Sequence, residues 1–163
     1  MLAEKAVKRF LEGYNCAQSV LLTMAEYWND RSALIPKIAT GFGGGIGRCG
    51  SVCGALTGGV MAIGVKYGTN EPSAEKRLQC YKLSQRLFKQ FELQHGTPYC
   101  KELIHYDLSN PNEQEKAHKA NVFEEKCVDF VRTSIEILLD LSENPKKPGT
   151  STNHPRRTPL KRT

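Results

Sequence analysis

The stretch Cys53-Gly54-Ala55-Leu56-Thr57-Gly58-Gly59-Val60-Met61-Ala62-Ile63-Gly64 decides the fold. It predicts a helix with one face of small residues, made by Ala55, Gly58, Gly59 and Ala62. Such a face lets a neighbouring backbone approach closely. Because glycine is a poor helix former in water, packing against other helices must hold this one. We therefore expect a central helix, with Cys53 at its start near the middle of a helical bundle.

Apolar residues at helical spacing predict further helices on both sides of this segment. One helix ends at Gly13, and the next is opened by Asn15 and led by Cys16. A third is expected from Pro72 to His95-Gly96, with Leu78 and Tyr81 on its apolar face.

The C-terminal half of the pattern predicts two more helices. One short helix is expected from Pro98 through Ile104. The last carries an apolar stripe from Phe123 to Leu141, with Cys127 on its buried face, and Asn121 with Glu124 predicts a capping box at its start. The fold class predicted is all-α, a compact helical bundle over residues 1–142.

A glycine-rich loop precedes the central helix, with six glycines in residues 41–50. Such a run implies positive φ angles or a group packed against the main chain. Its G-x-G-x-x-G pattern is not preceded by a convincing buried strand, so a dinucleotide site is disfavoured. We expect its N–H groups to form an anion nest or to line a thiolate or cluster. The cofactor-binding candidates are Gly43, Gly44, Gly45 and Arg48.

Three of the six cysteines, Cys16, Cys53 and Cys100, fall where a first helical turn is expected. Free N–H groups and the helix dipole at that position favour a thiolate. For Cys53 we also expect stabilisation by the nearby charge of Arg48. The alternative is that the cysteines are small buried hydrophobes, which is the preferred interpretation for Cys80.

Charge and composition separate a tail from the body. The chain has a net charge of +6, but residues 143–163 hold most of it and leave the body nearly neutral. This Pro-, Lys- and Arg-rich tail is predicted to be disordered, and a nucleic-acid partner is not favoured. The sequence shows no signal peptide and no membrane span, so we expect a cytoplasmic protein, where thiols are catalytic or bind metal.

The residues resemble the C_GCAxxG_C_C family of redox-active proteins. The resemblance rests on Gly13-Tyr14-Asn15-Cys16-Ala17-Gln18-Ser19-Val20, on Gly41-Phe42-Gly43-Gly44-Gly45-Ile46-Gly47, on Cys53-Gly54-Ala55-Leu56-Thr57-Gly58, and on the later Cys100 and Cys127. It implies an all-helical cytoplasmic protein whose four shared cysteines correspond to Cys16, Cys53, Cys100 and Cys127. It further implies electron transfer as well as thiol chemistry.

Several chemistries remain open for these cysteines. They are catalytic candidates for thiol–disulfide cycling, and Cys49 joins them as a resolving thiol or fifth ligand. Alternatively, Cys16, Cys53, Cys100 and Cys127 are metal ligands of an iron–sulfur cluster, most simply a two-iron one. Structural zinc is a lesser alternative, and a scaffolding protein with inert cysteines is another. The partners expected are a redox protein or a small thiol or disulfide, and homo-oligomerisation is left open.

Overall fold

The computed structural model describes residues 1–145 and is built from helices. In chain order they are α1 (Leu2–Leu11), α2 (Cys16–Tyr27), the 3₁₀ turn η1 (Lys37–Phe42), α3 (Gly54–Tyr67), α4 (Ala74–His95), α5 (Cys100–Ile104), α6 (Pro111–Lys119), the π-helical turn η2 (Phe123–Cys127) and α7 (Val128–Glu143). Within the described residues there is no strand, only one isolated bridge between Val52 and Tyr99. The all-α prediction is confirmed.

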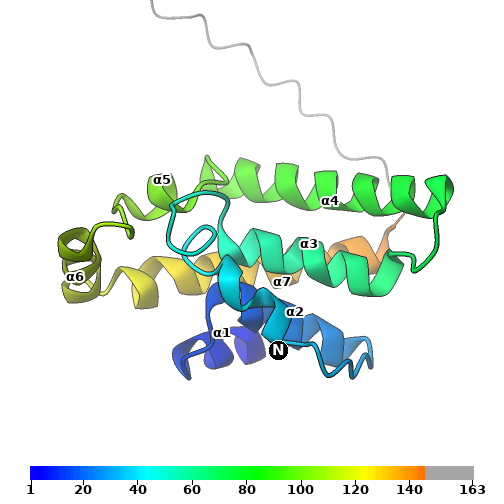
Figure 1. Ribbon diagram of the computed structural model, residues 1–163, viewed down its shortest axis with the longest axis horizontal. Coiled ribbons are helices and arrows are strands. Elements are labelled where there is room, and N and C mark those ends of the chain that lie inside the picture. The colour runs from blue at the N-terminus through cyan, green and yellow to red at the C-terminus, as the bar shows by residue number, and fades with distance from the viewer. Residues whose placement is uncertain (146–163) are drawn as a thin grey trace, which may run out of the picture.

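The bundle is arranged around α3 and α7. Figure 1 shows these two helices between α4 on one side and the α1–α2 pair on the other. The chain packs α3 against α2, α4 and α7, while α1 packs against α2 and α7. No helix among residues 1–145 is both long and apolar enough to cross a membrane. The predicted tail, 143–163, lies almost wholly outside the described residues, and the predicted division at residue 142 stays a prediction.

The small-residue face of α3 lets neighbouring helices approach closely, as the sequence predicts. A Cβ on Gly58 would lie 2.5 Å from the Ala17 carbonyl oxygen of α2, and one on Gly59 would lie 2.7 Å from a Leu87 methyl of α4. Two helices therefore approach α3 at adjacent residues, on different sides. The poor intrinsic helix propensity of this segment is offset by packing on both sides.

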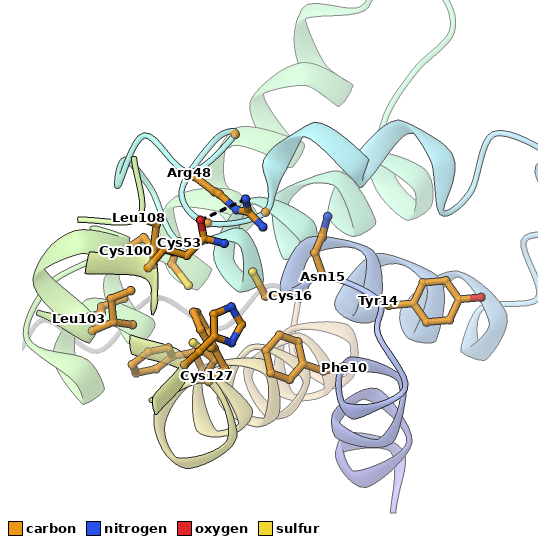
Figure 2. Close-up of a pocket in the computed structure, with 18 of the residues that line it drawn as sticks. Phe10, Tyr14, Asn15, Cys16, Arg48, Cys53, Cys100, Leu103, Leu108 and Cys127 are labelled. Carbon is orange, nitrogen blue, oxygen red and sulfur yellow. Dashed lines mark hydrogen bonds between the residues drawn. The ribbon is translucent and has the colours of Figure 1, made fainter. Parts of the chain in front are cut away.

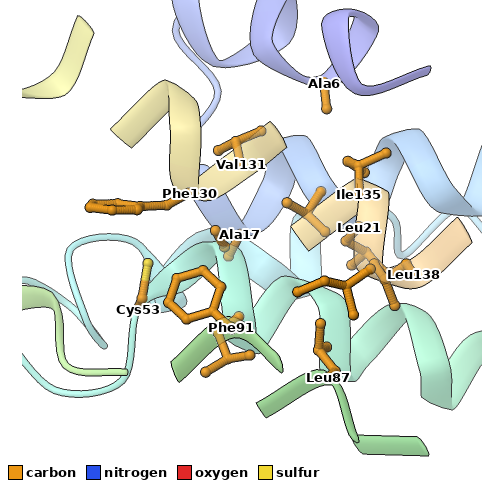
Figure 3. Packing of buried hydrophobic residues seen from close by; sticks show 14 of the residues in the cluster. Ala6, Ala17, Leu21, Cys53, Leu87, Phe91, Phe130, Val131, Ile135 and Leu138 are labelled. Carbon is orange, nitrogen blue, oxygen red and sulfur yellow. The ribbon is translucent and has the colours of Figure 1, made fainter. Parts of the chain in front are cut away.

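A continuous apolar core fills the space between the helices (Figure 3). Its central residues are Leu21 of α2, Leu87 and Phe91 of α4, and Ile135 and Leu138 of α7, all fully buried. Burial of each such side chain contributes about 1.5–3 kcal/mol. This core holds the end of the bundle where α3 begins, and with it the cysteines.

The glycine-rich loop adopts an unusual backbone. Five consecutive residues, 44 to 48, have φ between 58° and 71°, including the non-glycine residues Ile46 and Arg48. Left-handed φ at a β-branched residue is an outlier that costs of order 1–3 kcal/mol. A Cβ on Gly45 would meet the Ser51 carbonyl oxygen at 2.5 Å and Cys100 Cβ at 2.7 Å. Both expected reasons for the glycines, positive φ and close packing, are present.

Two predicted helix starts were wrong by two residues. Helix α4 begins at Ala74 rather than Pro72, because the Ser73 side chain accepts a hydrogen bond from the Lys76 N–H and caps it. Helix α5 begins at Cys100 rather than Pro98, because the segment before it pairs with the chain ahead of α3. The predicted apolar face of α4 was also too wide, since Leu78 and Tyr81 are more than half exposed.

The start of the last helix differs more from its prediction than the starts of α4 and α5 do. Asn121 has a φ of 50° and lies before the helix, so the predicted capping box with Glu124 is wrong. One π-helical turn follows and ends at Cys127, after which α7 runs regularly. Helix α6 was not predicted, although Asn110 caps it and Pro111 occupies its first turn.

Candidate functional site

Four cysteines from four different elements line one cavity of ≈ 500 Å³ at the end of the bundle (Figure 2). Cys16 is the first residue of α2, and Cys53 is the residue before α3. Cys100 is the first residue of α5, and Cys127 is the last of the π-helical turn. All four are free thiols. The structure therefore brings Cys16, Cys53, Cys100 and Cys127 to one cavity, as a shared catalytic or ligand set requires.

Cys16 is fixed by the cap of its helix. Asn15 and Gln18 form a reciprocal capping box, at 2.9 and 3.1 Å. Both side chains also reach Thr40 in η1: the Asn15 amide donates to its carbonyl and the Gln18 amide to its hydroxyl. A Cβ added to Gly54 would clash with the Cys16 sulfur, so only glycine fits at the start of α3.

Cys53 and Cys100 are brought together by backbone hydrogen bonds. The Cys53 N–H donates to the Pro98 carbonyl at 2.8 Å, and the Cys100 N–H donates to the Ser51 carbonyl at 2.7 Å. These bonds join two segments that are far apart in sequence. The positions of the two cysteines therefore depend on the backbone and not on their own side chains.

Burial raises the pKa of all four thiols. For Cys53 the pKa lies well above its ordinary value, first because of burial and then because thiolates at Cys16 and Cys100 would repel its charge. Burial, and then repulsion from a thiolate at Cys16, raises the pKa of Cys100 to about 12, and burial also raises the pKa of Cys127. The expectation that the helix start and Arg48 hold Cys53 as a thiolate is wrong for the reduced chain.

Several backbone N–H groups point at the Cys16 sulfur. Burial again raises its pKa, but the backbone N–H groups of Gly44 and Gly54 act in the opposite direction. These two donors belong to the glycine loop and to the first residue of α3. The loop therefore supplies one polar group, the Gly44 N–H, to one sulfur of the set, as its composition predicted.

The other candidates from the sequence lie at different distances from this cavity. Gly43, Gly44 and Arg48 line it, while Gly45 is buried below the loop against Cys100. Cys49 is exposed and is not among the lining residues, so the structure does not bring it to the other thiols. Cys80, in the first third of α4, packs against the core.

Sequence reasoning missed the outer wall of the cavity. Gln114 and His118, four residues apart on α6, line it together with Phe123 and Leu108. The cap of α6 at Asn110 and Pro111 was a readable signal for this helix, but nothing in the sequence indicates where α6 packs. His95 stands behind the cavity, its ring 4.9 Å from that of Phe130.

The four cysteines are also the candidate metal ligands. Within residues 1–145, no three His, Cys, Asp or Glu side chains lie close enough together to hold a single ion. The four cysteines instead share the lining of one cavity. Structural zinc, which requires four ligands around one ion, stays a lesser alternative.

Comparison with known proteins gives one family and one relative. The family model described as "Putative redox-active protein (C_GCAxxG_C_C)" matches residues 14–141. An uncharacterized protein of Archaeoglobus fulgidus is 29% identical, with the match covering 88% of this chain and 97% of that protein. No solved structure matches the chain.

Proposed function

This chain belongs to the C_GCAxxG_C_C family, and we propose that its redox centre is the cavity lined by Cys16, Cys53, Cys100 and Cys127. The single observation that carries the proposal is the convergence of four free thiols from four elements on one cavity. A scaffold with inert cysteines would have no need to bring them together.

We propose that these four cysteines hold a two-iron cluster. The donor set is all sulfur, which suits iron–sulfur clusters. Such a cluster has two ligands on each iron, so it does not need three thiols around one point. The cavity has room for a bound group, and the wall around the sulfurs is apolar, with Leu103, Ile104 and Phe130.

The raised pKa values support the same choice. Four neutral thiols buried beside one another are poor nucleophiles, because the thiolate is the reactive form. They are good ligands for a cation, which deprotonates the sulfur it binds. When bound, the cluster supplies one-electron transfer.

The residues around the sulfurs then have distinct tasks. The N–H groups of Gly44 and Gly54 face Cys16 and favour negative charge on that sulfur. Hydrogen bonds to cluster sulfurs tune reduction potential. Leu103 and Phe130 limit the access of water to the sulfurs. The backbone hydrogen bonds between residues 51–53 and 98–100 fix the positions of two ligands, Cys53 and Cys100.

The second candidate is dithiol–disulfide cycling between Cys53 and Cys100. Their backbone segments are hydrogen-bonded side by side, which favours this pair. In the oxidation, the two thiols lose two electrons and two protons to an oxidised partner protein or a small disulfide, and an S–S bond forms. The high pKa values of both thiols make this reaction slow at neutral pH.

The test is a visible spectrum and an iron assay on protein purified without oxygen. Charge-transfer bands with about two irons per chain are expected from the four-cysteine ligand set. Cys53→Ser should lose both while retaining its helical content. Cys80→Ser, a change of the same kind outside the cavity, should lose neither.

Other outcomes discriminate between the candidates. A colourless protein in which Cys53 and Cys100 form a disulfide reversibly would favour the second candidate. A colourless protein with no reversible thiol chemistry would contradict both and leave the scaffold alternative.

A further inference from the structure

The cavity extends beyond the cysteines to a mouth with a different chemistry. The mouth is formed by Arg48 of the glycine loop, Gln114 and His118 of α6, and the rings of Phe10 and Phe123. Figure 2 shows Arg48 on the glycine-loop side and Phe10 across the cavity from the cysteines Cys53 and Cys100. No carboxylate is among the lining residues.

The backbone of Arg48, at this mouth, has a strained conformation. Its φ of 68° ends the left-handed run of the loop. A strained residue at a cavity suggests a function that offsets the strain. The Arg48 side chain also packs closely on the Gly44 backbone, since a Cβ added to Gly44 would come within 2.9 Å of Arg48 Cγ.

The guanidinium has a neutral partner. In the amide orientation that satisfies both groups, the Gln114 oxygen lies 3.1 Å from both terminal nitrogens of Arg48. None of the ion pairs within residues 1–145 includes Arg48. The amide positions the guanidinium without neutralising it, so its charge is available to an anion.

The walls below Arg48 are apolar and aromatic. The His118 ring packs on Phe123 with ring centres 4.7 Å apart, and Leu108 is buried beside them. Pockets with this composition take small organic molecules, oriented by a few polar groups. A cation at the rim selects a ligand with a negative group at one end.

We propose that the mouth of the cavity binds a small organic anion with an apolar body, its charged group paired with Arg48 and its body against Phe10 and Phe123. Such a ligand lies between solvent and the thiols. This inference goes beyond the proposed redox function, because binding depends on the mouth and electron transfer on the cysteines.

The test is calorimetric titration of the full reduced chain with naphthalenesulfonate. The probe has an aromatic body and one fixed negative charge. Its uncharged counterpart of the same shape, naphthalenesulfonamide, is titrated in parallel. We expect one sulfonate per chain and binding of the sulfonamide at least about tenfold weaker, which corresponds to about 1.4 kcal/mol.

Two variants remove the charge of Arg48 in different ways. Arg48→Gln deletes it, and Gln114→Glu places a carboxylate where the amide now contacts the guanidinium. Each should weaken sulfonate binding about tenfold. The matched control is Asn112→Asp, which adds the same charge to an exposed position of α6 outside the cavity and should leave binding nearly unchanged.

The proposal is overturned by any of three results: no saturable sulfonate binding, equal affinity for the sulfonamide, or a loss in Asn112→Asp as large as that in Gln114→Glu. Loss of iron without loss of sulfonate binding would instead affect the redox proposal alone.

Discussion

Replacing Gly58 with alanine should separate α2 from α3 and destabilise the protein. The added Cβ would lie 2.5 Å from the Ala17 carbonyl oxygen and 2.9 Å from the Ala17 Cα. These atoms are backbone and cannot rotate away, so one helix must shift. Because Ala17 follows Cys16, the shift also moves a cysteine of the cavity.

The magnitude follows from two opposing effects. Overpacking costs about 1–3 kcal/mol, and a contact with rigid backbone favours the upper half of that range. Alanine regains about 1 kcal/mol of helix propensity. The net loss in the free energy of unfolding is about 1–2 kcal/mol, which lowers the melting temperature by about 2–8 °C in a chain of this size.

The matched control is Gly64→Ala in the same helix. Gly64 is exposed, and an added Cβ would have nothing within 4 Å, so only the gain in propensity remains. Its melting temperature should rise by about 2–4 °C. Thermal unfolding followed by far-ultraviolet circular dichroism measures both variants. A Gly58→Ala protein as stable as wild type would refute the close α2–α3 approach.

Two further predictions concern pH. Burial lowers the pKa of His95 below 6.5, so neutral His95 contributes stability above pH 6.5 that is lost as the pH falls below this value. In His95→Phe, the melting temperature should therefore fall less than in the wild type as the pH is lowered below 6.5. An unchanged dependence of the melting temperature on pH would contradict the assignment. Hydrogen bonds from Arg9 and Lys5 hold the pKa of Glu26 below 4.5, so its contribution is present above pH 4.5 and lost below it. Because Glu26 is partly exposed, Glu26→Gln should cost less than about 1 kcal/mol at neutral pH and reduce the acid sensitivity of unfolding.

The sequence predicted the central architecture because its signals are local. The small-residue face of α3 and the Asn15 cap of α2 each follow from a few neighbouring residues, and both are present. The missed elements depend on partners far away in the chain. The start of α5 at Cys100 is set by pairing with Ser51, and the position of α6 by its contacts across the cavity mouth.

The same distinction between local and long-range causes explains why the sequence did not predict the raised thiol pKa values. A helix start stabilises an anion by about 0.3–1 kcal/mol, and by up to about 2 kcal/mol in favourable burial. Raising the pKa of Cys100 from 9.0 to about 12 corresponds to about 4 kcal/mol against the thiolate. The helix start, and with it the dipole, can be predicted from the sequence. The larger cost, that of burying a charged thiolate, arises only when the fold buries the four thiols. Burial that suppresses the free thiolate therefore leaves a bound cation as the strongest means of forming it, which is why we propose the cluster ahead of the dithiol.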